Sequence, residues 1–276
     1  GRRAALERFA SPQLLGDLTA SVSARRRSVK RALVVAGVLL GGLALAGPQY
    51  GFTWEETQRR GIDVLIALDT SRSMLAQDVA PNRLERAKLA VRDLVDQLGS
   101  DRVGLIAFAG SAFLQCPLTL DHAAFLESLD ALQPGVIPTP GSDLASALRT
   151  AEQALATEQR NVKLLVLFSD GEDLGGSAIE AAKHAAEQGI RVFTVGVGSD
   201  NGELIPVPSA KGGTEFLKDP QGQYVKSKLD AETLRQVAEL TGGFYEPLGR
   251  RGEGVAAIYD RALAPLPKEE LASRMR

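Results

Sequence analysis

The stretch DVLIALDTSRSMLAQD, residues 63–78, decides how the rest of the chain is interpreted. Its first half contains a continuous apolar run, Val64–Leu68, which is typical of a strand buried on both faces of a parallel sheet. The run ends in a carboxylate, Asp69, and two hydroxyl groups follow at alternate positions, Ser71 and Ser73. The residues by themselves leave three interpretations open: a capped turn, a catalytic aspartate or a metal site.

Short apolar runs of the same kind recur along the chain, and stretches with helical spacing lie between them. This alternation predicts one α/β domain over residues 61–264, built as a doubly wound, mostly parallel sheet. The last strand is expected at the edge of the sheet, in TGGFYEPL, residues 241–248. The other predicted strands are Val103–Phe108, Leu164–Phe168 and Val192–Val197, and the predicted helices are Leu84–Leu98, Asp121–Leu132, Asp143–Ala156, Ser177–Gln188, Asp230–Thr241 and Gly254–Leu263.

One insertion interrupts this pattern at residues 202–230, GELIPVPSAKGGTEFLKDPQGQYVKSKLD. Its Gly-Gly and Asp-Pro-Gln-Gly sequences favour tight turns, so the segment is predicted to form a small β-hairpin excursion from the domain. The polar tail at residues 265–276 is expected to lead into a further C-terminal segment.

The first fifty residues differ in kind from the domain. Residues 1–31 are rich in Arg and Lys, and the apolar run ALVVAGVLLGGLALAG, residues 32–47, follows them. Extended to Phe52, the run predicts a transmembrane helix over residues 32–52, with residues 53–60 as a linker. A signal-peptide hydrophobic region and a buried core helix are the alternatives. The basic cluster before the run predicts a cytoplasmic N-terminus and a domain on the other side of the membrane.

Composition argues against several classes of partner and site. The formal net charge is −2, so the chain has no overall positive field for nucleic acid. Cys116 is the only cysteine, which excludes an intrachain disulfide and a cysteine-based metal cluster. Only two histidines are present, which argues against a histidine-based zinc or catalytic site.

Oxygen-bearing side chains follow the predicted strands at several places. Asp170 comes directly after the apolar run of KLLVLFS, as Asp69 does after the first run. The loop VIPTPGSDLASAL adds Thr139 and Ser142 just before a predicted helix. Because ligands of an open α/β sheet bind beyond the carboxyl ends of its strands, these groups are expected to converge there. Carboxylate and hydroxyl oxygens suit a hard cation, Mg²⁺ or Mn²⁺.

Three short motifs resemble the metal-ion-dependent adhesion site (MIDAS) of von Willebrand factor A (VWA) domains. They are DTSRS at residues 69–73, GSD at residues 141–143 and FSDGED at residues 168–173. The resemblance implies a set of metal ligands made up of Asp69, Ser71, Ser73, Ser142 and Asp170. In this family a threonine stands where the chain has Ser142, so Thr139 is the alternative ligand.

A closer resemblance covers nearly the whole chain. The basic N-terminal segment, LALAGPQYG, SMLAQDVAPNRLERAK, the insertion and LTGGFYEP are similar to the membrane-anchored VWA proteins of bacterial aerotolerance operons, the BatA/BatB type. This resemblance implies an anchor in the bacterial inner membrane, a periplasmic VWA domain and a role in envelope complex assembly or stress tolerance. It also implies a protein partner that presents Asp or Glu, and possible association with other VWA membrane proteins and a MoxR-type AAA+ ATPase.

Two other functions are compatible with a metal-binding strand end. One is a Mg²⁺-dependent phosphoester hydrolase with Asp69 as nucleophile, and the other is a structural membrane scaffold with an idle metal site. The hydrolase is disfavoured because Ser71 occupies the position of a general acid/base and cannot buffer a proton near neutral pH. We therefore expect a binding module rather than an enzyme. Ser142 also has an alternative interpretation, as the N-cap of the following helix.

Overall fold

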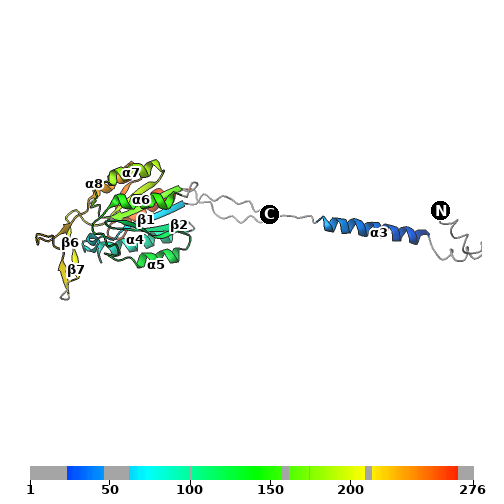
Figure 1. Ribbon diagram of the computed structural model, residues 1–276, viewed down its shortest axis with the longest axis horizontal. Helices are drawn as coiled ribbons and strands as arrows, with labels where there is room; N and C mark the ends of the chain where they lie inside the picture. Colours follow the sequence, from blue (N-terminus) through cyan, green and yellow to red (C-terminus); the bar gives the residue numbers. More distant parts are fainter. Residues whose placement is uncertain are drawn as a thin grey trace, which may run out of the picture. The chain divides into compact units, whose positions relative to one another are not determined.

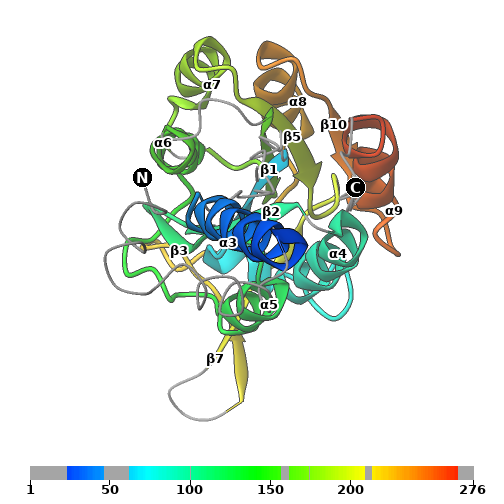
Figure 2. The ribbon, with the colours of Figure 1, turned by 90° about the vertical axis from the view of Figure 1, so that its right-hand side faces the viewer.

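The computed structural model divides the chain into two compact units, Gly1–Thr57 and Gln58–Arg276, which are considered separately. Figures 1 and 2 label many of the helices and strands. The structure describes residues 24–46, 62–99, 101–156, 162–173, 175–208 and 213–266.

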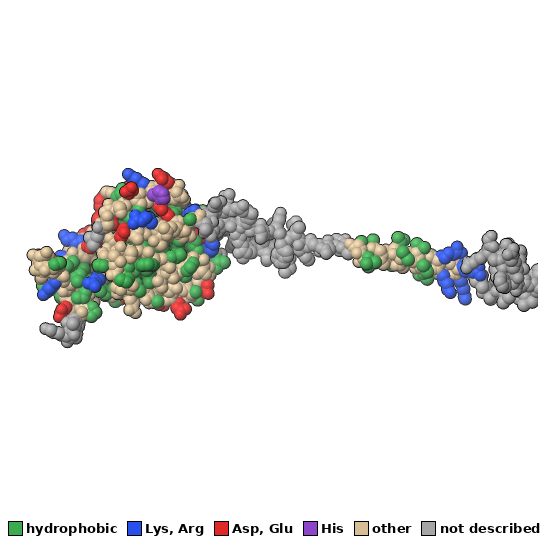
Figure 3. Space-filling model, in the orientation of Figure 1, with side chains coloured by type: hydrophobic (Ala, Val, Ile, Leu, Met, Phe, Trp, Pro, Cys, Tyr) green, Lys and Arg blue, Asp and Glu red, His purple; other side chains and the backbone are tan. Residues whose placement is uncertain are grey.

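The described part of the first unit is one helix, α3, Ala24–Leu45. It begins with a cluster of Arg and Lys side chains and continues as an apolar helix, as Figure 3 shows by colour. Within the span Arg25–Leu45, an 18-residue window has a mean hydropathy of 1.7, so by length and composition the helix can cross a membrane. The helix thus starts inside the basic segment predicted for residues 1–31. Residues 47–61, with the predicted continuation of the span and the linker, lie outside the described residues, as do residues 1–23.

The second unit is built on a six-stranded sheet with the order β10-β5-β4-β1-β2-β3. All neighbouring strands run parallel except β3, which pairs antiparallel with β2. The prediction of a mostly parallel α/β sheet is therefore confirmed. The strands are β1 Ile62–Asp69, β2 Arg102–Phe108, β3 Ala112–Thr119, β4 Val162–Ser169, β5 Arg191–Gly196 and β10 Tyr245–Pro247.

Helices cover both faces of this sheet, and each face has its own apolar core. In β1, Val64 and Ile66 belong to the core with α4, α5 and α9, whereas Leu65 and Ala67 belong to the core with α6, α7 and α8. Figure 2 shows the two groups of helices on opposite sides of the sheet. Period-two alternation in a strand buried on both sides explains why the run reads as continuously apolar. The helices are α4 Arg83–Leu98, α5 His122–Asp130, α6 Leu144–Leu155, α7 Ala178–Glu187, α8 Ala231–Leu240 and α9 Glu253–Ile258.

The sequence patterns missed β3 and placed some helix ends inaccurately. β3 is an edge strand with several exposed side chains and a proline, Pro117, so it has no continuous apolar run. Three aspartates that were placed inside helices are N-caps whose side chains accept backbone N–H groups: Asp121, Asp143 and Asp230. The last helix, α9, ends at Ile258 and continues as a π-helical turn, Tyr259–Leu263.

The insertion forms two short antiparallel pairs, as the turn residues predicted. The pair nearer the domain joins β6, Glu203–Leu204, to β9, Lys226–Ser227. The second pair joins β7, Pro206–Pro208, to β8, Thr214–Phe216. Figures 1 and 2 both show the β7 end of the insertion projecting away from the sheet and its helices.

Candidate metal centre

Asp69 lies at the carboxyl end of β1, between β4 and β2, where the strand order reverses. Its side chain is fully buried. Oδ1 accepts a hydrogen bond from the backbone N–H of Ser71 at 2.8 Å. Oδ2 accepts hydrogen bonds from the hydroxyl groups of Ser169 at 2.8 Å and Ser142 at 3.0 Å. Within the described parts of the chain, no Lys or Arg forms an ion pair with Asp69.

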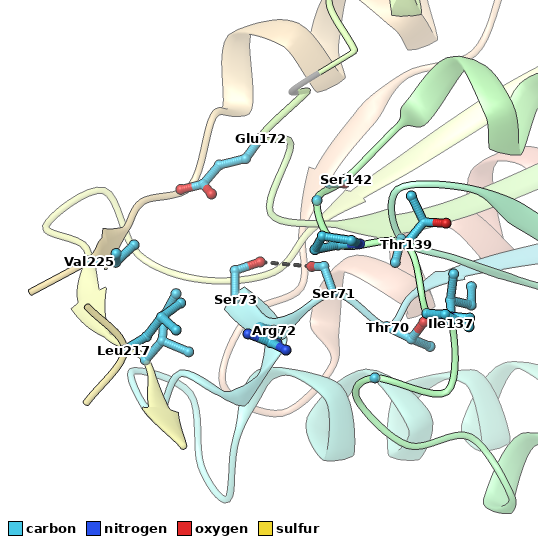
Figure 4. A pocket seen from close by; sticks show the side chains of 16 residues that line it. Thr70, Ser71, Arg72, Ser73, Ile137, Thr139, Ser142, Glu172, Leu217 and Val225 are labelled. Carbon is cyan, nitrogen blue, oxygen red and sulfur yellow. Dashed lines mark hydrogen bonds between the residues drawn. The ribbon is translucent and has the colours of Figure 1, made fainter. Parts of the chain in front are cut away.

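The first loop turns sharply after Asp69 and brings two hydroxyl groups together. The hydrogen bond from the Ser71 N–H to Asp69 closes an Asx turn, and the single 3-10 turn Arg72–Leu75 follows. In this turn Met74 is buried and fixes the loop against the core. The Oγ atoms of Ser71 and Ser73 then lie 2.9 Å apart, as the dashed line in Figure 4 shows.

The second loop supplies Ser142, which is 3% exposed. The N-cap of α6 is its neighbour, Asp143, which accepts the N–H of Ser146 at 3.0 Å. The alternative interpretation of Ser142 as the helix cap is therefore wrong, because its hydroxyl donates to Asp69 instead. Thr139 is exposed, and its carbonyl oxygen accepts the N–H of Gly110 at 3.1 Å. The geometry favours Ser142 over Thr139 as the hydroxyl that belongs with Asp69.

The third loop begins with Asp170, a second buried carboxylate. Its Oδ2 accepts hydrogen bonds from Nη1 of Arg83 at 3.0 Å and from the hydroxyl of Ser227 at 3.1 Å. Burial, and then the nearby charge of Asp69, raise the pKa of Asp170 to about 7, although a hydrogen bond from Ser73 acts in the opposite direction. Burial also raises the pKa of Asp69. Two carboxylates close together in a buried site disfavour each other's charge, and a cation beside them would relieve this cost.

A cavity of about 280 Å³ opens above these hydroxyl groups. Figure 4 shows Ser71 and Ser73 on its floor, with Leu217 and Val225 on one side and Thr139 on the other. The floor is polar and the flanking walls are largely apolar. The candidate centre is therefore reached from outside through a cleft lined on one side by the insertion.

The donor set at this centre consists of oxygen atoms only. It contains two carboxylates and three serine hydroxyls, and the described residues hold no group of three or more His, Cys, Asp or Glu placed to bind an ion. Mg²⁺ and Mn²⁺ accept such neutral and charged oxygen ligands and usually retain several waters. The residues present thus fit a hard cation and do not fit a thiolate or imidazole site.

Comparison with known proteins decides the family. Residues 64–172 match the model of the von Willebrand factor type A domain. A curated relative, the UPF0353 protein of Nocardia farcinica (strain IFM 10152), is 30% identical over 270 residues, which cover 92% of this chain and 76% of the relative. The chain belongs to the UPF0353 family of VWA-domain proteins.

Among solved structures, this VWA domain is similar to a BatB protein and to an aerotolerance-related membrane protein. The conserved hypothetical protein BatB from Bacteroides thetaiotaomicron is 37% identical, with a TM-score of 0.69 over 72% of this chain and 96% of that one. An aerotolerance-related membrane protein from Bacteroides fragilis NCTC 9343 is 35% identical, with a TM-score of 0.68 over 72% and 98%. Proximal thread matrix protein 1 from the mussel byssus, with a zinc-occupied MIDAS motif, shares the fold at 16% identity, with a TM-score of 0.53 over 72% and 44%.

Three residues of the VWA site were not singled out from the sequence. Ser169 donates to Asp69 and could have been noticed, because it precedes Asp170 in FSDGED. Ser227 belongs to the insertion and has no local signal that links it to the site. Arg83 looks like an ordinary residue at a helix start, yet its side chain is completely buried.

Arg83 connects the site to its surroundings. Its guanidinium donates to both oxygens of Asp78 at 2.8 Å, to Asp170 at 3.0 Å and to the hydroxyl of Ser227 at 2.7 Å. Asp78 in turn accepts the N–H and the hydroxyl of Ser199. Burial alone would raise the pKa of Asp78, but the hydrogen bonds and charge of Arg83 outweigh it and lower the pKa. The guanidinium of Arg83 thus holds both Asp170 of the third loop and Ser227, where the insertion joins the domain.

Proposed function

We propose that the chain is a membrane-tethered, metal-dependent protein-binding module with a MIDAS-type site for Mg²⁺ or Mn²⁺. The observation that carries the proposal is the convergence of Asp69, Asp170 and three serine hydroxyls at one edge of the sheet. Asp69 is surrounded there by hydroxyl and N–H donors alone, among the residues the structure describes. A buried carboxylate with neutral partners is a suitable ligand for a cation.

The side chains would have different roles in binding the ion. Asp69 would hold the ion, with the hydroxyls of Ser71, Ser73 and Ser142 as uncharged ligands or hydrogen-bond partners. Asp170 has one oxygen engaged by Arg83 and Ser227, so it would act with the other oxygen or through water. A cation with few charged ligands keeps residual positive charge, which would attract an Asp or Glu side chain of a partner protein.

The membrane anchor and the cellular role belong to the same proposal. The apolar helix α3 and the likeness to an aerotolerance-related membrane protein support anchoring in the bacterial inner membrane. The basic residues at the start of α3 support a cytoplasmic N-terminus and a periplasmic VWA domain. We further propose a role in envelope complex assembly or stress tolerance, with other VWA membrane proteins and a MoxR-type AAA+ ATPase as candidate partners.

Catalysis is not part of the proposal. The residue two positions after Asp69 is Ser71, which cannot act as a general acid or base near neutral pH. Asp69 is fully buried and is not among the residues that line the cavity, so it is not exposed there to attack a substrate.

Calorimetric titration of the detergent-solubilised chain with MgCl₂ or MnCl₂ tests the proposal. We expect binding of one ion in the wild type and loss of binding in Asp69→Ala, with the circular dichroism spectrum unchanged. Failure of the wild type to bind either ion at millimolar concentration would sink the metal hypothesis. Turnover of generic phosphoesters that disappears in Asp69→Ala would replace it with the hydrolase. Metal binding without any Mg²⁺-dependent partner in a pull-down would favour the idle scaffold.

A further inference from the structure

The insertion presents a row of three aliphatic side chains to the cavity. The backbone N–H of Leu217 donates to the carbonyl of Ile205, and the N–H of Val225 donates to the carbonyl of Leu217, both at 2.9 Å. These hydrogen bonds place Ile205, Leu217 and Val225 side by side on three adjacent segments. All three line the cavity, and Figure 4 shows Leu217 and Val225 directed toward it. We call this set the aliphatic row.

The opposite face of the insertion has a different character. Phe216 and Tyr224 are the chain neighbours of Leu217 and Val225, and successive side chains of an extended segment point to opposite faces. They stack edge to face with their ring centroids 6.3 Å apart, and they are 44% and 59% exposed. The insertion therefore separates an aliphatic inner face from an aromatic outer face, and only the inner face belongs to the cavity.

The rest of the cavity complements the aliphatic row. Ile137 lies across from it in Figure 4, Pro138 and Pro140 of the same loop also line the cavity, and the serine hydroxyls lie between the two sides. The volume of about 280 Å³ lies just below the range of roughly 300–1,000 Å³ typical of ligand pockets. The cavity thus suits a short piece of polypeptide with one apolar side chain.

The rim of the cavity carries one exposed cation and one acid, which are oriented differently. Arg72 is exposed and lines the cavity beside the serines. Glu172 also lines it, but its Oε1 accepts the backbone N–H of Lys228 at 2.9 Å and is directed to the insertion. Arg72 is therefore the charged side chain of this rim that is left for a carboxylate, within the part of the chain that the structure describes.

The inner wall is fixed in place at its base. Asp230 donates its backbone N–H to the carbonyl of Asp170 at 2.7 Å, and Leu229 donates its N–H to the carbonyl of Ser199 at 3.2 Å. Ser227 is held by Arg83. A wall that is anchored to the same residues as the candidate metal centre keeps a constant position relative to it, which lets one ligand contact both.

We propose that the cavity recognises an extended acidic–aliphatic segment of a partner protein. The Asp or Glu carboxylate would lie over the serine hydroxyls beside Arg72, and an adjacent branched aliphatic side chain would pack against the aliphatic row. This inference rests on the proposed function, because the carboxylate is the group that the bound cation would take. It adds that recognition depends on the residue next to the carboxylate, and that the insertion supplies this selectivity.

Three fluorescein-labelled peptides of equal length test the proposal on the full chain in detergent with saturating MgCl₂. One has a central aspartate flanked by leucines, the second has the aspartate flanked by serines, and the third has an asparagine flanked by leucines. Fluorescence anisotropy should show at least about tenfold tighter binding of the first than of the second, as expected for burial of one leucine side chain. The third should bind at least about a hundredfold more weakly than the first.

Two matched double variants locate the selectivity. Leu217→Ser with Val225→Ser should abolish the preference for the leucine-flanked peptide and keep the weak binding of the serine-flanked one. Phe216→Ser with Tyr224→Ser changes the outer face of the same segment and should leave the preference unchanged. Calorimetric Mg²⁺ binding by each variant shows that its centre is intact. If the Leu217→Ser, Val225→Ser double variant does not fold, the single variant Val225→Ser replaces it and should weaken the preference for the leucine-flanked peptide.

The outcomes separate this inference from the proposed function. Equal affinity for the leucine-flanked and serine-flanked peptides, or no peptide binding by the Mg²⁺-loaded protein, would overturn the cavity proposal and leave metal binding intact. Leucine-flanked binding that persists in EDTA would also overturn it, because the cavity would then act without the centre. A selectivity lost equally in the outer-face variant would show that the aliphatic row does not carry it. Absence of Mg²⁺ binding by the wild type would remove the proposed function itself.

Discussion

Strand β1 carries a buried carboxylate near each end, and the two are stabilised in different ways. Near its amino end, Asp63 is fully buried and accepts two hydrogen bonds from the guanidinium of Arg102, both at 2.8 Å. At the carboxyl end, Asp69 is equally buried but is surrounded by hydroxyl and N–H groups. The first carboxylate is neutralised by the protein, whereas the second is solvated by neutral dipoles.

This difference separates a structural carboxylate from one suited to a ligand. A buried charge that is already paired gains little from an added cation, while an unpaired one remains costly until a cation arrives. Asp170 is intermediate, because Arg83 contacts one of its oxygens and its pKa is still raised to about 7 by burial and by Asp69. All three carboxylates are buried, so burial does not distinguish them, whereas the presence or absence of a paired cation does.

Removal of the positive charge of Arg83, the partner of Asp170, is expected to have the largest effect. Arg83→Met leaves Asp78 and Asp170 buried without their shared partner, and we expect a loss of about 3–5 kcal/mol in the free energy of unfolding. Urea denaturation followed by circular dichroism in metal-free buffer measures it. Arg92→Met is the matched control, because Arg92 pairs with Asp130 at the surface and should cost at most about 1 kcal/mol. A loss below 1 kcal/mol in Arg83→Met would contradict the assigned role.

The same isosteric change at the two ends of β1 tests the comparison directly. In metal-free buffer, Asp63→Asn should cost about 1–3 kcal/mol, because it leaves Arg102 with a weaker partner. Asp69→Asn should change stability by less than about 1 kcal/mol, because it removes a buried charge that has no cation. Saturating Mg²⁺ should then raise the melting temperature of Asp63→Asn but not that of Asp69→Asn. Similar behaviour of the two variants would refute the distinction.

A smaller effect is expected from the hydroxyl that contacts Asp69. Ser142→Ala removes a donor to Oδ2 of Asp69, and we expect about tenfold weaker Mg²⁺ binding in calorimetry. Thr139→Ala is the control on the same loop, and its affinity should match the wild type, since Thr139 is exposed. The reverse result would make Thr139 the ligand.

The smallest effect is expected from an exposed counterpart of the Asp63 pair. Nδ1 of His184 lies 2.9 Å from Oε2 of Glu152. This hydrogen bond, and then the negative charge of Glu152, raise the pKa of His184 above 6.5. Because the folded pKa exceeds the unfolded one, this pair stabilises the protein below about pH 6.5 and loses its effect as the pH rises through the folded pKa. Glu152→Gln should return the pKa of His184, followed by NMR, toward 6.5. An unchanged pKa would show that the pair does not form.

Sequence patterns were enough to predict the side chains that directly follow buried strands. They were not enough to predict an exposed edge strand or contacts between residues far apart in the chain. Asp69 and Asp170 could be placed at one edge because each follows an apolar run, and the carboxyl ends of parallel strands meet there. The edge strand β3 was missed because its exposed side chains interrupt the apolar pattern.

Two features of the site could not be obtained from local patterns. Ser142 and Asp143 are both good helix caps by residue type, and only the fold shows that Asp143 caps α6. The buried guanidinium of Arg83 donates to Ser227, which lies 144 residues further along the chain. No short-range pattern carries information on a contact of that separation.

The insertion has two parts that make different contacts, a root bound to the domain and a projecting tip. Its root is tied to the domain through Ser227, Leu229 and Asp230, which contact the residues of the centre or their neighbours. Its tip carries the strands β7 and β8 and projects from the domain. A change of sequence in the tip or the aliphatic row therefore leaves these contacts of the root and the centre in place. Under the proposed function, the specificity for a partner thus lies in a part of the molecule that can vary independently of the metal centre.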